Sequence, residues 1–293
     1  MKTSSIAKLA LGLTLVSMSA VAMAAVSPKT TGISITKHNL GAGGQFNYTT
    51  STTEICVFCH TPHGADSSAA VPLWNRHLTS NPAQYNTYAS LGTSTLDSES
   101  TEIGSVSLAC LSCHDGTQAM NVVINSPGSG TTGDVNVSGT DGNGNNVYIS
   151  TASGVDCAAT DGSCGGFNEF NMMSQVSGEM IYLATDLRND HPISIQYAGS
   201  LDGGTTAGHD ADFNAATSVT VASGTTVFYI EADGSTGKSK HDLPLYNRVG
   251  GTLDTQPLVE CATCHDPHTS NTTFLRHVDG NTGSATCLTC HNK

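Results

Sequence analysis

Hydrophobic residues along this chain are sparse and rarely recur with the period of a helix. One continuous apolar run stands out at residues 9–21, and after it Gly, Asn, Asp, Ser and Thr separate short apolar stretches. Alternating apolar positions predict two strands, at residues 218–222 and 226–231, joined by a turn at residues 223–225. The predicted fold is therefore mostly irregular coil, with short helices and a few short β-strands.

The apolar run at the amino terminus has the features of a secretory signal peptide. Lys2 and Lys8 accompany its start, and Ala22, Met23 and Ala24 supply a small-residue cleavage pattern. The run is shorter than the roughly 20 residues that a membrane-spanning helix needs, and no later run reaches that length. Residues 1–24 are predicted to be removed, leaving an exported protein that is secreted or, alternatively, periplasmic, with no membrane span.

Four motifs in the mature chain consist of two cysteines three residues apart, followed at once by histidine. They are Cys56, Cys59 and His60; Cys110, Cys113 and His114; Cys261, Cys264 and His265; and Cys287, Cys290 and His291. This is the attachment signal of c-type haem, in which the thiols add to the porphyrin vinyl groups and the histidine is the proximal ligand of the iron. A single CxxC pair would equally suggest a zinc knuckle or a thioredoxin-like site. Because histidine follows every pair, we predict four covalently bound haem c groups, with the short helices at these motifs.

The composition fits a fold that is built around such groups. The chain is 38% hydrophobic and 5% aromatic with 31 Gly, so an apolar core of ordinary size is hard to build from the polypeptide alone. Its net charge is −13, and its 11 Lys and Arg residues are scattered. A polyanion without a basic patch has no electrostatic route to nucleic acid, which we exclude as a partner.

Ten cysteines less the eight in haem motifs leave Cys157 and Cys164. In an oxidising compartment these two are expected to form a local structural disulfide. The predicted organisation is an amino-terminal arm with the first two haems at residues 25–120, a loop- and β-rich insert with the disulfide at 121–255, and the last two haems at 256–293. These parts form one integrated haem-cored domain.

Twelve histidines less the four proximal ones leave eight that could bind the far side of an iron. They are His38, His63, His77, His191, His209, His241, His268 and His277. Methionine could also serve, but bis-histidine ligation is preferred because histidine is in surplus. The favoured distal ligands are His38, His63, His191 and His268, with His241 in reserve.

His63 and His268 each lie three residues after a proximal histidine, in the patterns CHTPH and CHDPH. Neither is expected to bind the haem of its own motif, since the proximal ligand already holds one face. Three residues span at most about 10 Å, so a ligand here would bring a neighbouring haem close. The alternative is a surface histidine after a proline turn.

The two halves of the chain also share a weak sequence similarity. The words PLWNR at residues 72–76 and PLYNR at residues 244–248 are similar, and a Lys-His pair precedes both the first and the third haem motif. Duplication of a two-haem unit would explain this, and so would shared local packing on haem.

The combination of KHNL, CVFCHTPH, CLSCHDG, DHPIS, CATCHDPH, FLR and CLTCHNK resembles secreted tetrahaem cytochromes of the OmcE type. The resemblance covers both haem-bearing ends of the chain but little of the insert. It implies a mostly coil backbone, bis-histidine irons and assembly into extracellular filaments with one continuous chain of haems. It also implies that His38 ligates a haem of the adjacent subunit, across a non-closing interface.

Three functions follow from these patterns. The first is electron conduction through an extracellular filament of this chain, with redox proteins or extracellular acceptors as further partners and no substrate transformed. The second is a soluble periplasmic electron shuttle. The third is a multihaem reductase, which needs an iron with an open face, and eight spare histidines give no sign of one. We therefore predict that the protein is not an enzyme.

Overall fold

The computed structural model describes residues 32–41, 43–44, 52–92, 98–118, 123–125, 182–199, 210–248 and 257–292. All of these belong to one compact unit. The predicted signal peptide and the predicted pair of Cys157 and Cys164 lie outside these ranges, as does His209. Among the described residues, no helix combines the length and the apolar character required to cross a bilayer.

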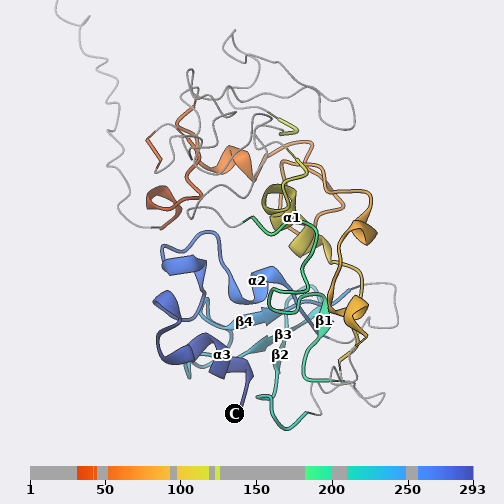
Figure 1. Cartoon of the computed structure of the whole chain (residues 1–293). Helices are drawn as coiled ribbons and strands as arrows, with labels where there is room; N and C mark the ends of the chain where they lie inside the picture. Colours follow the sequence, from red (N-terminus) through yellow and green to blue (C-terminus); the bar gives the residue numbers. More distant parts are fainter. Residues whose placement is uncertain are drawn as a thin grey trace, which may run out of the picture. The chain divides into compact units, whose positions relative to one another are not determined.

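Each haem motif forms about one turn of helix. Helix α1 spans Ser105–His114, α2 spans Cys261–Cys264 and α3 spans Ala285–Cys290, while the first motif forms the 3-10 turn η2 at Cys56–Phe58 (Figure 1). One turn is what the motif requires, because residues three and four apart lie on the same face of a helix. The prediction of short helices at the haem motifs is confirmed in the described part of the chain, although α1 begins five residues before Cys110.

Other short turns lie outside the motifs. They are the 3-10 turns η1 Gly32–Ile35, η3 Pro82–Gln84, η4 Tyr88–Leu91, η5 Thr272–Phe274 and η6 Asp279–Ser284. Their causes are local. Pro82 begins η3 with its φ already set for a helix, and Gly92 ends η4 in the left-handed region that a residue with a Cβ rarely adopts.

A three-stranded antiparallel sheet has the order β2-β3-β4. Strand β2, Thr217–Thr220, pairs with β3, Thr226–Ile230, which in turn pairs with β4, Leu243–Leu245. The predicted hairpin is therefore confirmed, with ends that differ by one or two residues. Gly224 makes the turn possible, since its φ is +82° and its N–H donates to the carbonyl of Val221 over 2.8 Å.

A second, two-stranded sheet joins distant parts of the chain. Strand β1, Ile195–Gln196, pairs antiparallel with β5, Leu258–Val259. An isolated bridge between Tyr246 and Leu258 connects β5 to the segment that follows β4. This pairing carries the start of the third haem motif, because Cys261 follows β5 directly.

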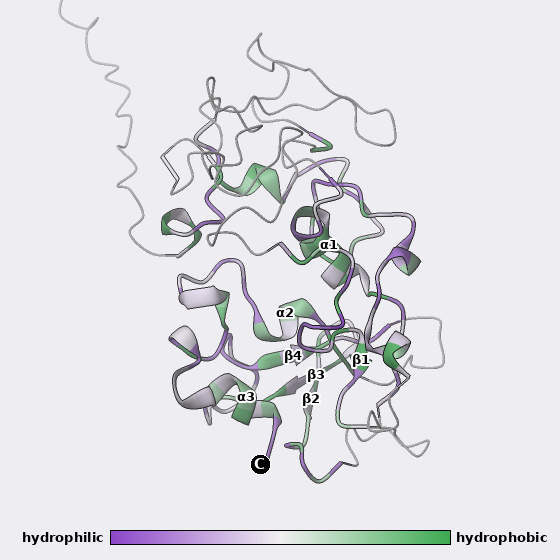
Figure 2. Cartoon of the chain, viewed as in Figure 1, coloured by the Kyte–Doolittle hydropathy of each residue, from purple (hydrophilic) through white to green (hydrophobic). Residues whose placement is uncertain are grey.

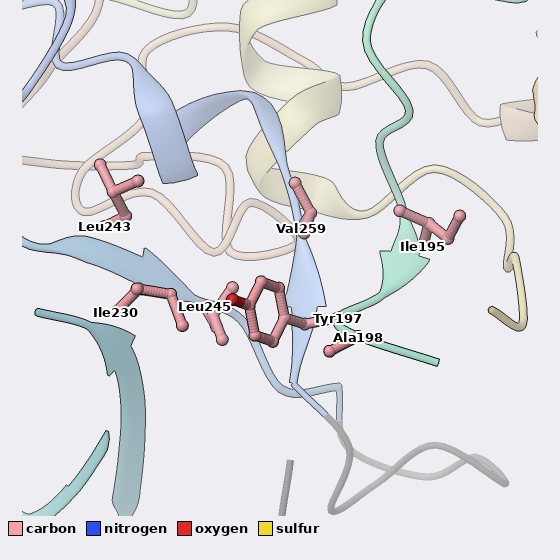
Figure 3. Packing of buried hydrophobic residues seen from close by; sticks show 7 residues of the cluster. All are labelled: Ile195, Tyr197, Ala198, Ile230, Leu243, Leu245 and Val259. Carbon is pink, nitrogen blue, oxygen red and sulfur yellow. The ribbon is translucent and has the colours of Figure 1, made fainter. Parts of the chain in front are cut away.

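A small apolar core lies between these strands, as Figure 3 shows. Its buried members are Ile195, Tyr197, Ala198, Ile230, Leu243, Leu245 and Val259. The Tyr197 hydroxyl at its edge donates to the carbonyl of Asn214 at 2.7 Å and lies 3.2 Å from that of Cys290. The core also supports the fourth haem motif, because Cys290 packs against it.

A second apolar cluster packs on α1. It consists of Tyr85, Ile103, Leu108, Leu111 and Leu187. Figure 2 shows the general pattern, with apolar residues concentrated in the helices and strands and polar residues along much of the connecting coil. Apolar residues are therefore concentrated in the elements that carry or support the haem motifs.

Candidate functional site

The backbone arranges each CxxCH motif in the same way. In three of the four motifs, the histidine N–H donates to the carbonyl of the first cysteine over 2.8–3.1 Å; the pairs are His60–Cys56, His265–Cys261 and His291–Cys287. In the remaining motif, the second along the chain, the residues from Cys110 to His114 lie inside α1. This turn puts both thiols and the imidazole on one side of the backbone, as attachment to one porphyrin requires.

Two of the proximal imidazoles are fixed by a second hydrogen bond. Nδ1–H of His60 donates to the carbonyl of Pro72 over 2.7 Å, and Nδ1–H of His265 donates to that of Thr273 over the same distance. An anchored Nδ1–H leaves Nε2 with a free lone pair, which is the usual arrangement of a metal-binding histidine. These two residues therefore fit the role of proximal ligand.

No disulfide joins any of the eight motif cysteines. Burial raises the pKa of Cys59 to about 12 and that of Cys264 to about 11, so these thiols are held in the neutral form. A tetrahedral zinc site needs four converging ligands with cysteine as thiolate. Among the described residues, no group of three or more His, Cys, Asp and Glu side chains converges in that way.

The separation of the His60 and His268 rings matches that of two imidazoles bound to one iron. Their centroids are 6.1 Å apart and their planes differ by 13°. A histidine nitrogen bonds a metal at roughly 2.0 Å and the ring centroid lies about 1.1 Å behind it, so two rings on one iron have centroids about 6.2 Å apart. The first proximal histidine is thus paired with one of the favoured distal residues.

His38 and His114 form a second pair at the same separation. Their centroids are 6.1 Å apart with an interplanar angle of 71°, and Phe274 stacks on His38 at 4.2 Å. Burial lowers the pKa of His38 to about 4, with His114 contributing and the Pro267 carbonyl opposing the shift. His38 is therefore neutral at physiological pH, as an iron ligand must be.

His191 lies near the third and fourth motifs. Burial lowers its pKa, and the rings of His291 and His265 lower it further. Its Nδ1–H donates to the carbonyl of Pro192 over 3.0 Å, which leaves Nε2 free. His63, in contrast, is exposed, and the described structure brings no ring partner to it.

The other spare histidines occupy varied surroundings. His241 donates from Nδ1 to the carbonyl of Arg276 over 3.1 Å, so it keeps the same free Nε2 as His191. His277 has a buried Nδ1 without a hydrogen-bond partner in the described part of the chain and borders a surface hollow of about 530 Å³ beside α3. His77 lies 3.8 Å from the carboxylate of Asp66.

The first and third motifs are built on the same hydrogen-bonding plan. After His60, the N–H of Thr61 donates to the carbonyl of Leu73, and after His265 the N–H of Asp266 donates to the carbonyl of Phe274. Both acceptors have a positive φ, 57° for Leu73 and 59° for Phe274. A non-glycine residue rarely adopts this conformation, so its recurrence at matching positions indicates two equivalent units.

Side chains repeat the plan as well. Nδ2 of Asn75 donates to the carbonyl of Val57 over 2.6 Å, and Nε of Arg276 donates to that of Ala262 over 2.9 Å. The segment equivalent to residues 72–75 is therefore 273–276. The similarity of PLWNR to PLYNR does not correspond to this equivalence, because Leu243–Leu245 belongs to strand β4.

A buried carboxylate joins the second and third motifs. Glu260, 2% exposed, pairs with Arg248 at 2.6 Å and accepts hydrogen bonds from the hydroxyls of Ser107 and Ser194. A Cβ on Gly104 would collide with this ion pair, which explains a glycine at the start of α1. Sequence reasoning missed Glu260, although a glutamate directly before CxxCH was a visible signal.

The thiols of Cys110 and Cys261 meet where α1 and α2 pack. They form a hydrogen bond, and this bond raises the pKa of Cys110. The N–H of Cys261 also donates to the Ser107 hydroxyl over 3.1 Å. The attachment points of the second and third haems are therefore in contact.

A family model described as a doubled CXXCH motif matches residues 257–293, which contain the third and fourth motifs. No match was found among curated proteins. The matched segment includes α2 and α3, whose backbone and histidine geometry fit covalent haem attachment as described above. The doubled motif identifies this chain as a candidate of the multihaem c-type cytochrome class, whose members bind haem covalently and transfer electrons.

Proposed function

We propose that this chain carries four covalently attached haems and transfers electrons between them, without transforming a substrate. The observation that supports this best is the separation of 6.1 Å in two histidine pairs, His60–His268 and His38–His114. Both separations fit an iron held by two imidazoles. When bound, each haem supplies a one-electron Fe(III)/Fe(II) couple.

The ligand pairs follow from these contacts and from the equivalence of the two units. His268 follows His265 by three residues and pairs with His60, so the equivalent residue, His63, is the natural distal partner of His265. His191 is left for the fourth iron, since its buried ring lies near His291. His241, with a free Nε2, is the reserve ligand.

The chain's own groups then have three tasks. Backbone carbonyls at Pro72 and Thr273 hold the proximal imidazoles in the tautomer that binds iron. The link of three residues limits the backbone span from His265 to His268 to about 10 Å, so the irons that His265 and His60 would hold would be close neighbours. Histidine ligands on both faces would exclude water and substrates from a bound iron, which would favour electron transfer over catalysis.

Export and assembly form a further part of the proposal. The predicted signal peptide and the OmcE-type resemblance support a secreted protein that polymerises into a conducting filament, with a soluble periplasmic shuttle as the second candidate. The proximity of His38 to His114 in the same chain supports ligation within one subunit. Filament contacts would then depend on other residues than His38.

Mass spectrometry of the exported chain tests the central proposal. The mature chain is expected to carry the mass of four haems, with all eight motif cysteines resistant to thiol reagents. The ferric spectrum should be entirely low-spin. Free thiols or bound zinc at these cysteines would overturn the proposal, and electron microscopy of the secreted fraction would separate filament from shuttle.

A further inference from the structure

The two equivalent units differ at the residue that follows the proximal histidine. In the first unit this residue is Thr61, and in the second it is Asp266. Both donate their backbone N–H to the equivalent carbonyl, of Leu73 and Phe274 respectively. The two positions thus make the same backbone hydrogen bond and differ in their side chains.

The carboxylate of Asp266 binds the imidazole of His268. Nδ1–H of His268 donates to Oδ1 over 2.9 Å, and the backbone N–H of His268 donates to the same oxygen over 2.9 Å. Nη1 of Arg276 lies 3.5 Å from Oδ2, the other oxygen of the carboxylate. His268 is therefore held at two points by one side chain.

Thr61 provides no such contact to His63. Its hydroxyl donates to the His63 carbonyl over 3.1 Å and accepts a hydrogen bond from Nδ2 of Asn125 over 3.1 Å. Asn125 donates to the same His63 carbonyl over 2.6 Å. The first unit therefore fixes the backbone of the distal histidine and leaves its ring without a carboxylate from this position.

We propose that Asp266 is a positioning residue that orients His268 towards the iron held by His60 and lowers the reduction potential of that haem. A carboxylate that accepts the Nδ1 proton makes the imidazole a stronger donor at Nε2, which stabilises Fe(III) relative to Fe(II). The duplicated unit lacks this device, so the two haems of the pair are tuned differently. The inference rests on the proposed function, in which His268 is a distal ligand.

Two substitutions separate the charge from the shape of this side chain. Asp266→Asn keeps an oxygen that can accept both hydrogen bonds but removes the charge. Asp266→Thr introduces the residue that the equivalent turn already contains, so its backbone is expected to fold. Asp266→Glu keeps a carboxylate and should recover most of the wild-type behaviour.

The measurement is a spectroelectrochemical titration of the haem-loaded protein, with haem content determined by mass. One of the four midpoint potentials should become more positive in both the Asn and Thr variants. A tenfold change in the ratio of oxidised to reduced haem corresponds to about 59 mV for one electron. The matched control is Asp186→Asn, which removes a carboxylate that pairs with Arg188 at 2.6 Å, and it should leave all four potentials unchanged.

The outcomes distinguish this inference from the proposed function. Unchanged potentials in variants that retain four haems would overturn the role of Asp266 and leave the haem assignment intact. Loss of haem from both variants would also overturn it, because Asp266 would then serve attachment or folding. Fewer than four haems in the wild-type chain would instead contradict the proposed function.

Discussion

His268 lies beside His60 with its ring centroid 6.1 Å away and its ring nearly parallel, although the two residues come from opposite ends of the chain. The contact depends on the coil that returns from α2 and on the Asp266 carboxylate that holds His268. A haem attached through Cys56 and Cys59 would consequently obtain its second ligand only after the carboxyl-terminal part of the chain has folded.

Replacement of His268 by alanine should remove the distal ligand of one haem. About a quarter of the low-spin ferric signal should then convert to high-spin, since one iron in four becomes five-coordinate or takes water. Electron paramagnetic resonance at low temperature measures both species. The haem mass should remain at four, because attachment depends on the cysteines.

His77→Ala is the matched control for that experiment. His77 lies near Asp66 and, in the proposed pairing, binds no iron. Its spectrum should equal that of the wild type. A high-spin signal in this variant, or none in His268→Ala, would contradict the assignment of His268.

The two observed histidine pairs should also be spectroscopically distinct. The planes of His60 and His268 differ by 13°, whereas those of His38 and His114 differ by 71°. Parallel imidazoles interact with the same iron d orbital and split the degenerate pair, while perpendicular imidazoles interact with one each. The ferric protein should therefore show both a rhombic and a highly axial low-spin signal, and His38→Ala should abolish an axial one.

Features defined by residues close together in the sequence could be predicted from it. The haem motifs need only one turn each, and the hairpin at β2 and β3 follows from alternation and a glycine turn. The apolar core could not be predicted in this way. Its members, such as Ile195, Leu243 and Val259, come from separate strands of two or three residues, so no local pattern reveals that they meet.

The pairing of ligands was equally hidden in the sequence. Eight spare histidines offered many combinations, and spacing alone could not show that His268 faces His60. The equivalence of the two units was also obscured, because the return to the proximal histidine takes 12 residues from His60 to Pro72 but 8 from His265 to Thr273. Asp266, between two histidines in CHDPH, was a signal that could have been used.

If His38 ligates a haem of its own subunit, the coordination of the haem irons should not change with protein concentration. A monomer isolated by size exclusion and diluted should keep four six-coordinate low-spin haems. Ligation across a subunit interface would instead give a high-spin fraction that rises on dilution. Absorbance near the Soret maximum, recorded across a dilution series, distinguishes the two cases.

The ion pair of Glu260 with Arg248 should be important for stability as well as for the approach of two haems. Glu260→Ala leaves the Arg248 guanidinium partly buried and two serine hydroxyls, of Ser107 and Ser194, without their acceptor. Breaking a buried pair by removing one partner costs about 3–5 kcal/mol.

Chemical denaturation of the haem-loaded protein measures this loss of unfolding free energy. In the same variant, α2 should also move away from α1. Asp186→Ala removes the exposed ion pair of Asp186 with Arg188, which water screens, and should cost much less stability than Glu260→Ala. Equal losses in the two variants would contradict the role of Glu260.

Because Cys110 and Cys261 meet beside this carboxylate, Glu260→Ala should also slow electron exchange between the second and third haems, which a flash-reduction experiment would detect.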